Sequence, residues 1–239
     1  GKMEHGWLDS EGQRYYLDTE TGIAATGFKT IDGITYYFNE TGQLQHLLQK
    51  IGEHYYFFGR YSGKMEHGWL DSEGQRYYLD PETGIAAIGW LEMENKKYYF
   101  NDQGQLYRSL QTVNNKQFYF DDVTGELLYG WIDNGKDKYY SDMKTGEILT
   151  GLVEINQKKY YFNEKGQLQH LLQKIGDNYY FFGRYSGEMQ YGWLSSENKM
   201  YYLDPIDGHA YIGKKVIDGV EYTFREDATL ISQFITKNN

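Results

Sequence analysis

The chain of 239 residues contains no cysteine and only two prolines. Without cysteine, disulfides and thiolate metal sites are excluded, so the fold has to be stabilised by packing alone. No apolar run approaches the roughly 18 residues that a transmembrane helix needs, and the first residues do not resemble a signal peptide. The sequence therefore predicts neither insertion into a membrane nor an export signal of its own.

Positive charge is also scarce, because 24 lysines and arginines stand against 34 aspartates and glutamates, for a formal net charge of -10. No basic stripe runs along the chain. Both features argue against nucleic acid or an anionic membrane surface as a partner.

Aromatic rings are what the chain has in excess. It contains 26 tyrosines, 12 phenylalanines and five tryptophans, together 18% of its residues, and 28 glycines. The mean hydropathy is nevertheless -0.75. The apolar material is thus concentrated in rings within a polar background, which is not an average globular composition.

Aromatic doublets recur along the whole chain at spacings of 19 to 22 residues. They are Tyr15-Tyr16, Tyr36-Tyr37, Tyr55-Tyr56, Tyr77-Tyr78, Tyr98-Tyr99, Phe118-Tyr119, Tyr139-Tyr140, Tyr160-Tyr161, Tyr179-Tyr180 and Tyr201-Tyr202, with a degraded eleventh at Tyr222-Thr223. Self-similarity at such a period indicates a repeat architecture. We predict one array of eleven short units over residues 1–239.

A second, longer period lies on top of the first. Residues 1–18 recur unchanged as residues 63–80, an offset of 62, and the tryptophans keep that step at Trp7, Trp69, Trp131 and Trp193. Two further phrases, GQLQHLLQKIG and YYFFGRYSG, each recur after 124 residues. Three short units therefore form one super-repeat, which predicts a screw of about a third of a turn per unit.

Each unit has the pattern of a β-hairpin. In residues 27–39, two β-prone runs flank Asp32-Gly33, a dipeptide that suits a tight turn with positive φ. Equivalent turns are predicted at Glu11-Gly12, Glu73-Gly74, Glu94-Asn95, Asn114-Asn115, Asn134-Gly135, Glu197-Asn198 and Asp218-Gly219. The connectors have their own glycines, at Gly22, Gly42, Gly84, Gly104, Gly125, Gly146 and Gly166.

The doublets predict how the hairpins pack. Adjacent residues of a strand point to opposite faces, so one ring can lie inward and the other outward. An isolated hairpin is marginal in water, and these units must therefore stack on their neighbours. We predict an all-β, elongated β-solenoid of tandem hairpins without a single central core.

The motif of Gly-Trp or Gly-Phe, a turn, YYL or YYF, and then Thr-Gly resembles the cell-wall-binding, or choline-binding, repeat family. That family includes the C-terminal repeats of large clostridial toxins and of glucan-binding glucosyltransferases. The resemblance is carried by the doublets and by Gly6-Trp7, Gly68-Trp69, Gly89-Trp90, Gly130-Trp131 and Gly192-Trp193. It implies a left-handed solenoid with hairpins related by about 120°. It also implies an extracellular module that binds glycans or choline and is attached to a larger secreted protein.

One departure from the family pattern disfavours choline. Choline-type repeats generally place a tryptophan before the doublet, where it completes an aromatic cage for a quaternary ammonium. That place is filled here by Arg14, Thr35, His54, Arg76, Lys97, Gln117, Lys138, Lys159, Asn178, Met200 and Glu221. None is aromatic. The motif KKYYFN resembles the toxin and glucan-binding branches more closely. The longer repeat that interrupts the short toxin repeats at the sugar site is, however, missing from this sequence.

Every third unit differs from the others, because YYFFGRYSG leads there into the next Gly-Trp. A sugar pocket needs a planar ring beside fixed polar donors. Two junctions offer this combination: Arg60, Tyr61, His67 and Trp69 in the first, and Arg184, Tyr185, Tyr191 and Trp193 in the second. The intermediate junction is predicted to be degraded, since Asp121 and Asp122 replace its Gly-Arg. Alternatively, both tryptophans are interior stacking residues and the arginines pair with surface carboxylates.

Neither metal binding nor catalysis is predicted. His5 and His67 are repeat copies whose equivalents are Tyr129 and Tyr191, which suggests planar surface contacts, and the acidic connectors lack the ligand pattern of an EF-hand. No nucleophile motif, catalytic pair or phosphate loop is present. We expect no enzyme activity and no cofactor.

Three functions remain open on the sequence: a carbohydrate-binding array, a choline or teichoic-acid anchor, and a spacer rod. The phase at which the chain begins suggests a piece of a larger polypeptide. Residues 203–239 have the pattern of a degenerate cap, because Lys214 replaces the ring after glycine and Thr223 the second tyrosine.

Overall fold

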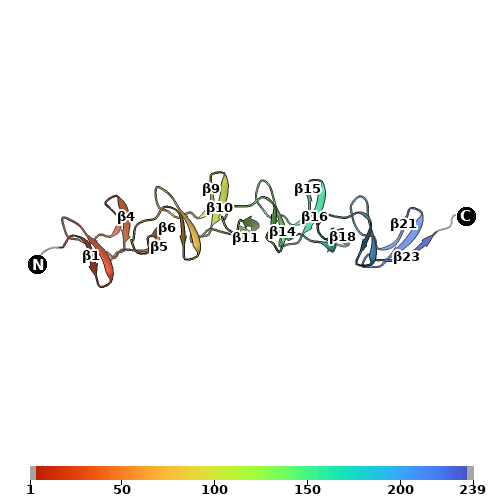
Figure 1. Cartoon of the computed structure of the whole chain (residues 1–239), viewed down its shortest axis with the longest axis horizontal. Coiled ribbons are helices and arrows are strands. Elements are labelled where there is room, and N and C mark those ends of the chain that lie inside the picture. The colour runs from red at the N-terminus through yellow and green to blue at the C-terminus, as the bar shows by residue number, and fades with distance from the viewer. Residues whose placement is uncertain (1–3, 236–239) are drawn as a thin grey trace. The chain divides into compact units, whose positions relative to one another are not determined.

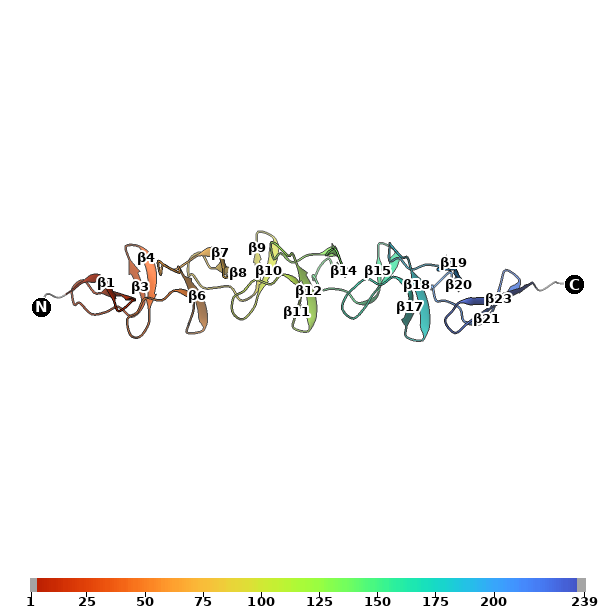
Figure 2. The same cartoon turned by 60° about the horizontal axis from the view of Figure 1, so that its bottom comes forward.

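The structure is a computed structural model that describes residues 4–235, with only the backbone described for residues 232–235. Within this range it contains strands and no helix, so nothing there is long and apolar enough to cross a membrane as a helix. The strands form ten two-stranded sheets and one three-stranded sheet (Figures 1 and 2). The prediction of an all-β chain of eleven hairpins is confirmed.

The chain divides into two compact units. The first comprises Gly1–Gln111 and Phe120–Leu127, and the second comprises Thr112–Tyr119 and Leu128–Asn239. The boundary falls within the hairpin of β11 (Ser109–Val113) and β12 (Lys116–Phe120).

The strands before this hairpin are β1 (Gly6–Ser10), β2 (Gln13–Leu17), β3 (Gly27–Ile31), β4 (Ile34–Phe38), β5 (Leu47–Ile51), β6 (His54–Phe58), β7 (Gly68–Ser72), β8 (Gln75–Leu79), β9 (Gly89–Met93) and β10 (Lys96–Phe100). Those after it are β13 (Gly130–Asp133), β14 (Lys138–Ser141), β15 (Gly151–Ile155), β16 (Lys158–Phe162), β17 (Leu171–Ile175), β18 (Asn178–Phe182), β19 (Gly192–Ser196), β20 (Lys199–Leu203), β21 (Gly213–Ile217), β22 (Val220–Phe224) and β23 (Leu230–Ile235). Each odd-numbered strand up to β21 pairs with the next strand, and β23 pairs with β22.

Two-residue turns close most hairpins. Asp32 and Gly33, between β3 and β4, have φ values of 49° and 79°, as the sequence predicted. The predicted turn at Asn134-Gly135 is wrong, because β13 and β14 are joined by the four residues 134–137. There the Asn134 side chain accepts hydrogen bonds from the backbone N–H groups of Lys136 and Asp137, which stabilises the longer loop.

The third hairpin corrects the register read from the doublets. Leu48 pairs with Phe57 in β5–β6, in the place that Trp69 and Tyr78 occupy in β7–β8. The structural doublets are therefore Tyr56-Phe57 and, in β17–β18, Tyr180-Phe181. The strand register is fixed by the residue that follows the structural doublet. In nearly every hairpin this residue is a fully buried phenylalanine or leucine.

The core is a series of small clusters. Fully buried side chains follow the doublets at Phe38, Phe58, Leu79, Phe100, Phe120, Phe162, Phe182 and Leu203. One cluster joins Phe57 of β6 to Tyr77 and Leu79 of β8 and to Ala86 of the following connector. At the equivalent place β14 has Ser141, which is also fully buried and donates a hydrogen bond to the Leu128 carbonyl. Each hairpin thus buries its rings against a neighbouring hairpin, as predicted for units that are marginal alone.

Both rings of a doublet take part in packing. In β8, Tyr77 is buried, and Tyr78 lies edge-on to Trp69 with ring centroids 5.1 Å apart. The same tryptophan contacts Tyr98 of β10 at 5.2 Å. The second ring is therefore half-buried rather than free on the outside, because the Gly-Trp ring covers it.

The connectors carry turns of their own and tie successive hairpins together. After β8, Asp80 Oδ1 accepts the backbone N–H groups of Glu82 and Thr83, and Gly84 has the predicted positive φ, 72°. The backbone N–H of Leu106, in the connector after β10, donates to the Arg76 carbonyl of β8 at 2.8 Å. Hydrogen bonding from the Thr83 backbone and hydroxyl lowers the pKa of Asp80.

Candidate functional site

The two predicted tryptophans are packing residues. Trp69 lies edge-on to Tyr78 and Tyr98, and the Arg76 guanidinium lies 4.8 Å from its ring centroid. Trp193 packs in the same way on Tyr202 and Tyr222. These contacts join one hairpin to the next, as the stacking alternative expects, although Trp193 is not interior, since it is 39% exposed.

The predicted arginines are ion-paired. Arg60 Nη2 donates to Glu73 Oε1 at 2.5 Å, and Arg184 Nη2 donates to Glu197 Oε1 at 2.7 Å. Both glutamates lie in the turn of the following hairpin. His67 Nδ1 lies 3.2 Å from the Asp80 carbonyl oxygen. The first predicted junction therefore uses its arginine, histidine and tryptophan for internal contacts.

The tyrosines of the predicted junctions remain exposed. Tyr61 is 89% exposed and its repeat equivalent Tyr185 is 88% exposed, whereas Tyr191 is 42% exposed. Tyr61 lines a pocket with residues of the first hairpin, not with Trp69. Of the first predicted set, only Tyr61 lines this pocket.

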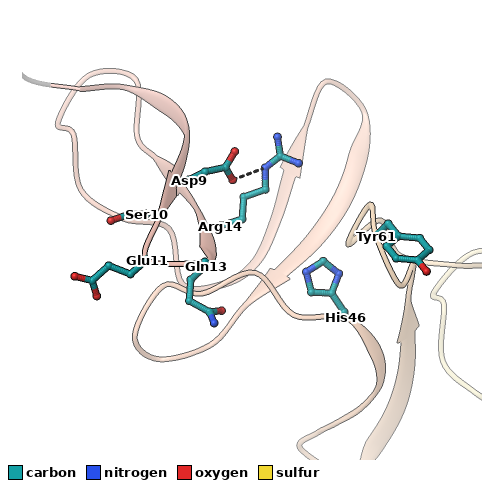
Figure 3. A pocket seen from close by; sticks show the side chains of 8 residues that line it. Asp9, Ser10, Glu11, Gln13, Arg14, His46 and Tyr61 are labelled. Atoms are coloured by element: carbon teal, nitrogen blue, oxygen red, sulfur yellow. Dashed lines mark ion pairs between the residues drawn. The ribbon is translucent and has the colours of Figure 1, made fainter.

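This pocket has a volume of about 470 Å³ and lies between the first hairpin and two later connectors (Figure 3). Its lining consists of Asp9, Ser10, Glu11, Gly12, Gln13, Arg14, His46 and Tyr61. Asp9 and Arg14 face each other across β1 and β2, His46 directly precedes β5, and Tyr61 lies between β6 and β7. In the view of Figure 3, His46 lies between Arg14 and Tyr61, and the Glu11 carboxylate points away from them.

The polar groups of the pocket are held in place. Arg14 Nε lies 3.3 Å from Asp9 Oδ1, and its guanidinium carbon lies 4.9 Å from the Trp7 ring centroid. His46 Nδ1 lies 3.0 Å from the Gly59 carbonyl oxygen. A carbonyl only accepts, so Nδ1 carries the hydrogen, and Nε2 of the neutral ring is left as an acceptor. The pocket therefore presents a donor, two acceptors and an exposed ring, which suits a ligand rich in hydroxyl groups.

Sequence reasoning missed Arg14 and His46 as members of a site. His46 and Tyr61 both recur 124 residues later, as His170 and Tyr185, and both are lost in the middle super-repeat. This shared recurrence was the available signal. It was hidden because the two residues belong to different units.

One group of side chains could offer ligands to a metal ion: Asp204, Asp207 and His209, whose ligand atoms lie within 4.8 Å of one another. These atoms already bond to each other and to the connector. The Tyr211 hydroxyl donates to Asp204 Oδ2 at 2.6 Å, and His209 Nδ1 lies 2.6 Å from Asp207 Oδ1. The Tyr211 bond, followed by the backbone N–H groups of Ile206 and Asp207, lowers the pKa of Asp204 to about 2. The candidate ligand atoms are therefore used in hydrogen bonds that stabilise the connector turn.

Comparisons with known proteins agree with the repeat pattern. The family model of the putative cell wall binding repeat matches residues 26–44, 88–106 and 150–168, which contain the hairpins β3–β4, β9–β10 and β15–β16. A segment of 86 residues is 32% identical to Toxin A of Clostridium novyi. That match covers 32% of this chain and 4% of the toxin, so the chain corresponds to a small part of that relative.

Two solved structures share the fold at low identity. CbpJ of Streptococcus pneumoniae TIGR4 has a TM-score of 0.62 at 22% identity, over 95% of this chain and 94% of CbpJ. Choline binding protein F of Streptococcus pneumoniae has a TM-score of 0.60 at 20% identity, over 97% of this chain and all of that chain. Three segments of the chain therefore match the putative cell wall binding repeat, and the shared hairpin fold agrees with the resemblance seen in the sequence.

Proposed function

We propose that the chain is a non-catalytic carbohydrate-binding module that attaches a larger secreted protein, a toxin or a cell-wall or glucan enzyme, to surface glycans. The observation that carries this proposal is the exposed Tyr61 ring at the edge of a pocket lined by fixed polar groups. Aromatic faces stack on sugar rings, and fixed polar groups bind the hydroxyls. The module acts outside the cell or at its surface, and neither nucleic acid nor membrane insertion is part of this function.

Glycans are preferred to choline partly because the protein's own cations occupy the faces of two of the five tryptophans. Arg14 lies over Trp7 and Arg76 over Trp69, each within 5 Å of the ring centroid. A quaternary ammonium would have to displace a guanidinium from these faces. A choline or teichoic-acid anchor remains the alternative function, and elution of the bound chain from an anion-exchange resin by free choline would favour it. A spacer that binds nothing is the other alternative.

We also propose that residues 1–239 form one array in which successive hairpins are related by about 120°, with residues 203–239 as a cap. In support, connectors in both compact units form the same backbone hydrogen bond to the hairpin before the one that they follow. The Leu106 N–H donates to the Arg76 carbonyl of β8, and the Leu168 N–H donates to the Lys138 carbonyl of β14. The third strand β23 beside β22 is compatible with a cap. Small-angle X-ray scattering tests the array, since a solenoid predicts an extended particle and a compact one would contradict it.

The function is tested by binding of the labelled chain to an array of surface glycans. We expect retention on at least one glycan class, competed by the free oligosaccharide. Absence of binding to every glycan, with the chain folded by circular dichroism, would contradict the proposal. Exchange of the array for an unrelated rod in the parent protein separates binding from spacing, because a spacer would be replaceable without loss of activity.

A further inference from the structure

Four side chains of the Tyr61 pocket have chemical counterparts 124 residues later in the chain. Site I comprises Asp9, Arg14, His46 and Tyr61. The residues 124 positions later are Asp133, Lys138, His170 and Tyr185, called site II. They offer the same groups in the same order: a carboxylate, a cation, an imidazole and a phenol.

The contacts of site II repeat those of site I. Lys138 Nζ lies 3.5 Å from Asp133 Oδ2, as Arg14 lies beside Asp9. His170 Nδ1 lies 3.0 Å from the Gly183 carbonyl oxygen, the distance also found between His46 and its own carbonyl partner. The tyrosines are almost equally exposed, at 89% and 88%. The two sites therefore share these four groups and their internal contacts, but the adjoining turn has two residues at site I and four residues, 134–137, at site II.

The middle super-repeat keeps the ion pair and lacks the rest. Arg76 Nε lies 3.5 Å from Asp71 Oδ1, but Arg108 stands in place of the imidazole and Val123 in place of the phenol. Val123 is 74% exposed, so the connector still presents its side chain. This copy lacks the exposed connector tyrosine and the imidazole, although Tyr107 lines the pocket that contains Arg76 and Arg108.

The connector that presents the tyrosine differs from the others for a steric reason. A Cβ on Gly59 would lie 2.2 Å from Ser62 Oγ, and one on Gly183 would lie 2.4 Å from Ser186 Oγ. Only glycine allows the serine to approach this closely. In the middle copy Asp121 replaces this glycine and accepts the Thr124 backbone N–H at 2.7 Å. The Gly-Arg-Tyr-Ser turn and the exposed tyrosine therefore occur together at both sites.

The charges and the ring limit the ligand class. A carboxylate beside a guanidinium or ammonium offers an acceptor and a donor to neighbouring sugar hydroxyls, and the phenol offers a flat face to the C–H side of a pyranose. Each ion pair is neutral in sum, and the chain carries a net charge of -10. These charges disfavour carboxylated or sulfated sugars.

We infer that sites I and II are two related binding sites for a neutral hexose unit of a glycan, with Tyr61 and Tyr185 as the stacking platforms. This inference rests on the proposed carbohydrate-binding function. Two sites on one chain strengthen its attachment to a multivalent glycan surface, although each site alone is weak.

The test uses the full chain and an array of oligosaccharides that end in glucose, galactose or N-acetylglucosamine, each with an acidic counterpart that ends in sialic acid or a uronic acid. The best neutral oligosaccharide is then titrated by isothermal calorimetry. We expect two sites per chain, one site in Tyr61→Ala or Tyr185→Ala, and binding weakened roughly tenfold or more at each altered site. Val123→Ala, at the equivalent exposed position of the middle super-repeat, is the matched control and should bind as the unaltered chain does.

The outcomes separate the inference from the proposed function. If the unaltered chain binds glycans and the double variant Tyr61→Ala/Tyr185→Ala binds them equally well, the sites are refuted while the function stands. Preference for the acidic counterparts would refute the ligand class. If no oligosaccharide binds, the proposed function itself fails. The exposure of both tyrosines makes folding of the variants easy to preserve, and circular dichroism checks it.

Discussion

Two glycines with similar positive φ values help to separate packing from backbone strain. Gly125, in the connector after β12, has a φ of 75°, and Gly89, at the start of β9, has a φ of 71°. A Cβ on Gly125 would lie 2.5 Å from Leu106 Cδ2, whereas a Cβ on Gly89 would have no heavy atom within 4 Å. Gly125→Ala and Gly89→Ala therefore carry the same φ penalty but different steric penalties.

The magnitudes follow from these two terms. An alanine at such a φ costs about 1–2 kcal/mol. Leu106 is 7% exposed and packs in a cluster with Tyr98 and Phe100, so it cannot withdraw freely from a new methyl group. Overpacking of this kind costs a further ~1–3 kcal/mol. We expect Gly89→Ala to lose about 1–2 kcal/mol and Gly125→Ala about 2–5 kcal/mol.

The assay has to report locally, because a repeat array does not unfold as one two-state domain. Native-state hydrogen exchange measures the opening free energy at individual amides, such as the Leu127 N–H that donates to the Lys97 carbonyl. The double variant Gly125→Ala/Leu106→Ala should lose less than the sum of its single changes, since the smaller side chain makes room. Equal losses in the two glycine variants, or strict additivity in the double variant, would refute the steric reasoning.

Three further predictions concern single side chains. The pKa of Asp204 is lowered to about 2, below its value of ~3.9 in an unfolded chain, so its contribution to stability is present above pH ~4 and is lost as the pH falls through ~2. Tyr211→Phe removes the hydroxyl donor and should raise this pKa in a carboxyl-carbon NMR titration. An unchanged pKa would contradict the assigned cause. Ser141→Ala leaves the Leu128 carbonyl without its hydroxyl donor and should lose ~1–3 kcal/mol in the exchange assay, whereas no loss would mean that the bond contributes nothing. Trp69→Ala should destabilise the hairpins on either side by roughly 2–4 kcal/mol and leave glycan affinity at site I unchanged, and a loss of that affinity would restore Trp69 to the site.

The fold was largely predictable because its rules are local. The Asp32-Gly33 turn, the connector glycines and the doublets each depend on a few adjacent residues, and the structure confirms the hairpins that they predict. The errors arose where the local pattern was ambiguous. Tyr55-Tyr56 looks like a doublet, but burial of Phe58 shifts the phase by one residue.

The candidate site was only partly predictable. Tyr61 and Tyr185, which the sequence proposed as ligand contacts, are exposed rings, and Trp69 was grouped with Tyr61 because the two are near in sequence. The structure uses Trp69 to cover the rings of its own and the following hairpin. When a ring and an arginine are close in sequence, the sequence does not show which of the two side chains is used in internal contacts and which remains available to a ligand.

The sequence by itself therefore determined the units: how many hairpins there are, where most of them turn, and which residues repeat after 62 or 124 positions. Turn chemistry and strand alternation act within a few residues and need no partner. Only the tertiary structure decided which residues meet. Arg14, His46 and Tyr61 come from different repeats of the sequence and share one pocket. They meet because each hairpin must bury its rings against its neighbours, and this packing brings distant connectors beside a hairpin turn.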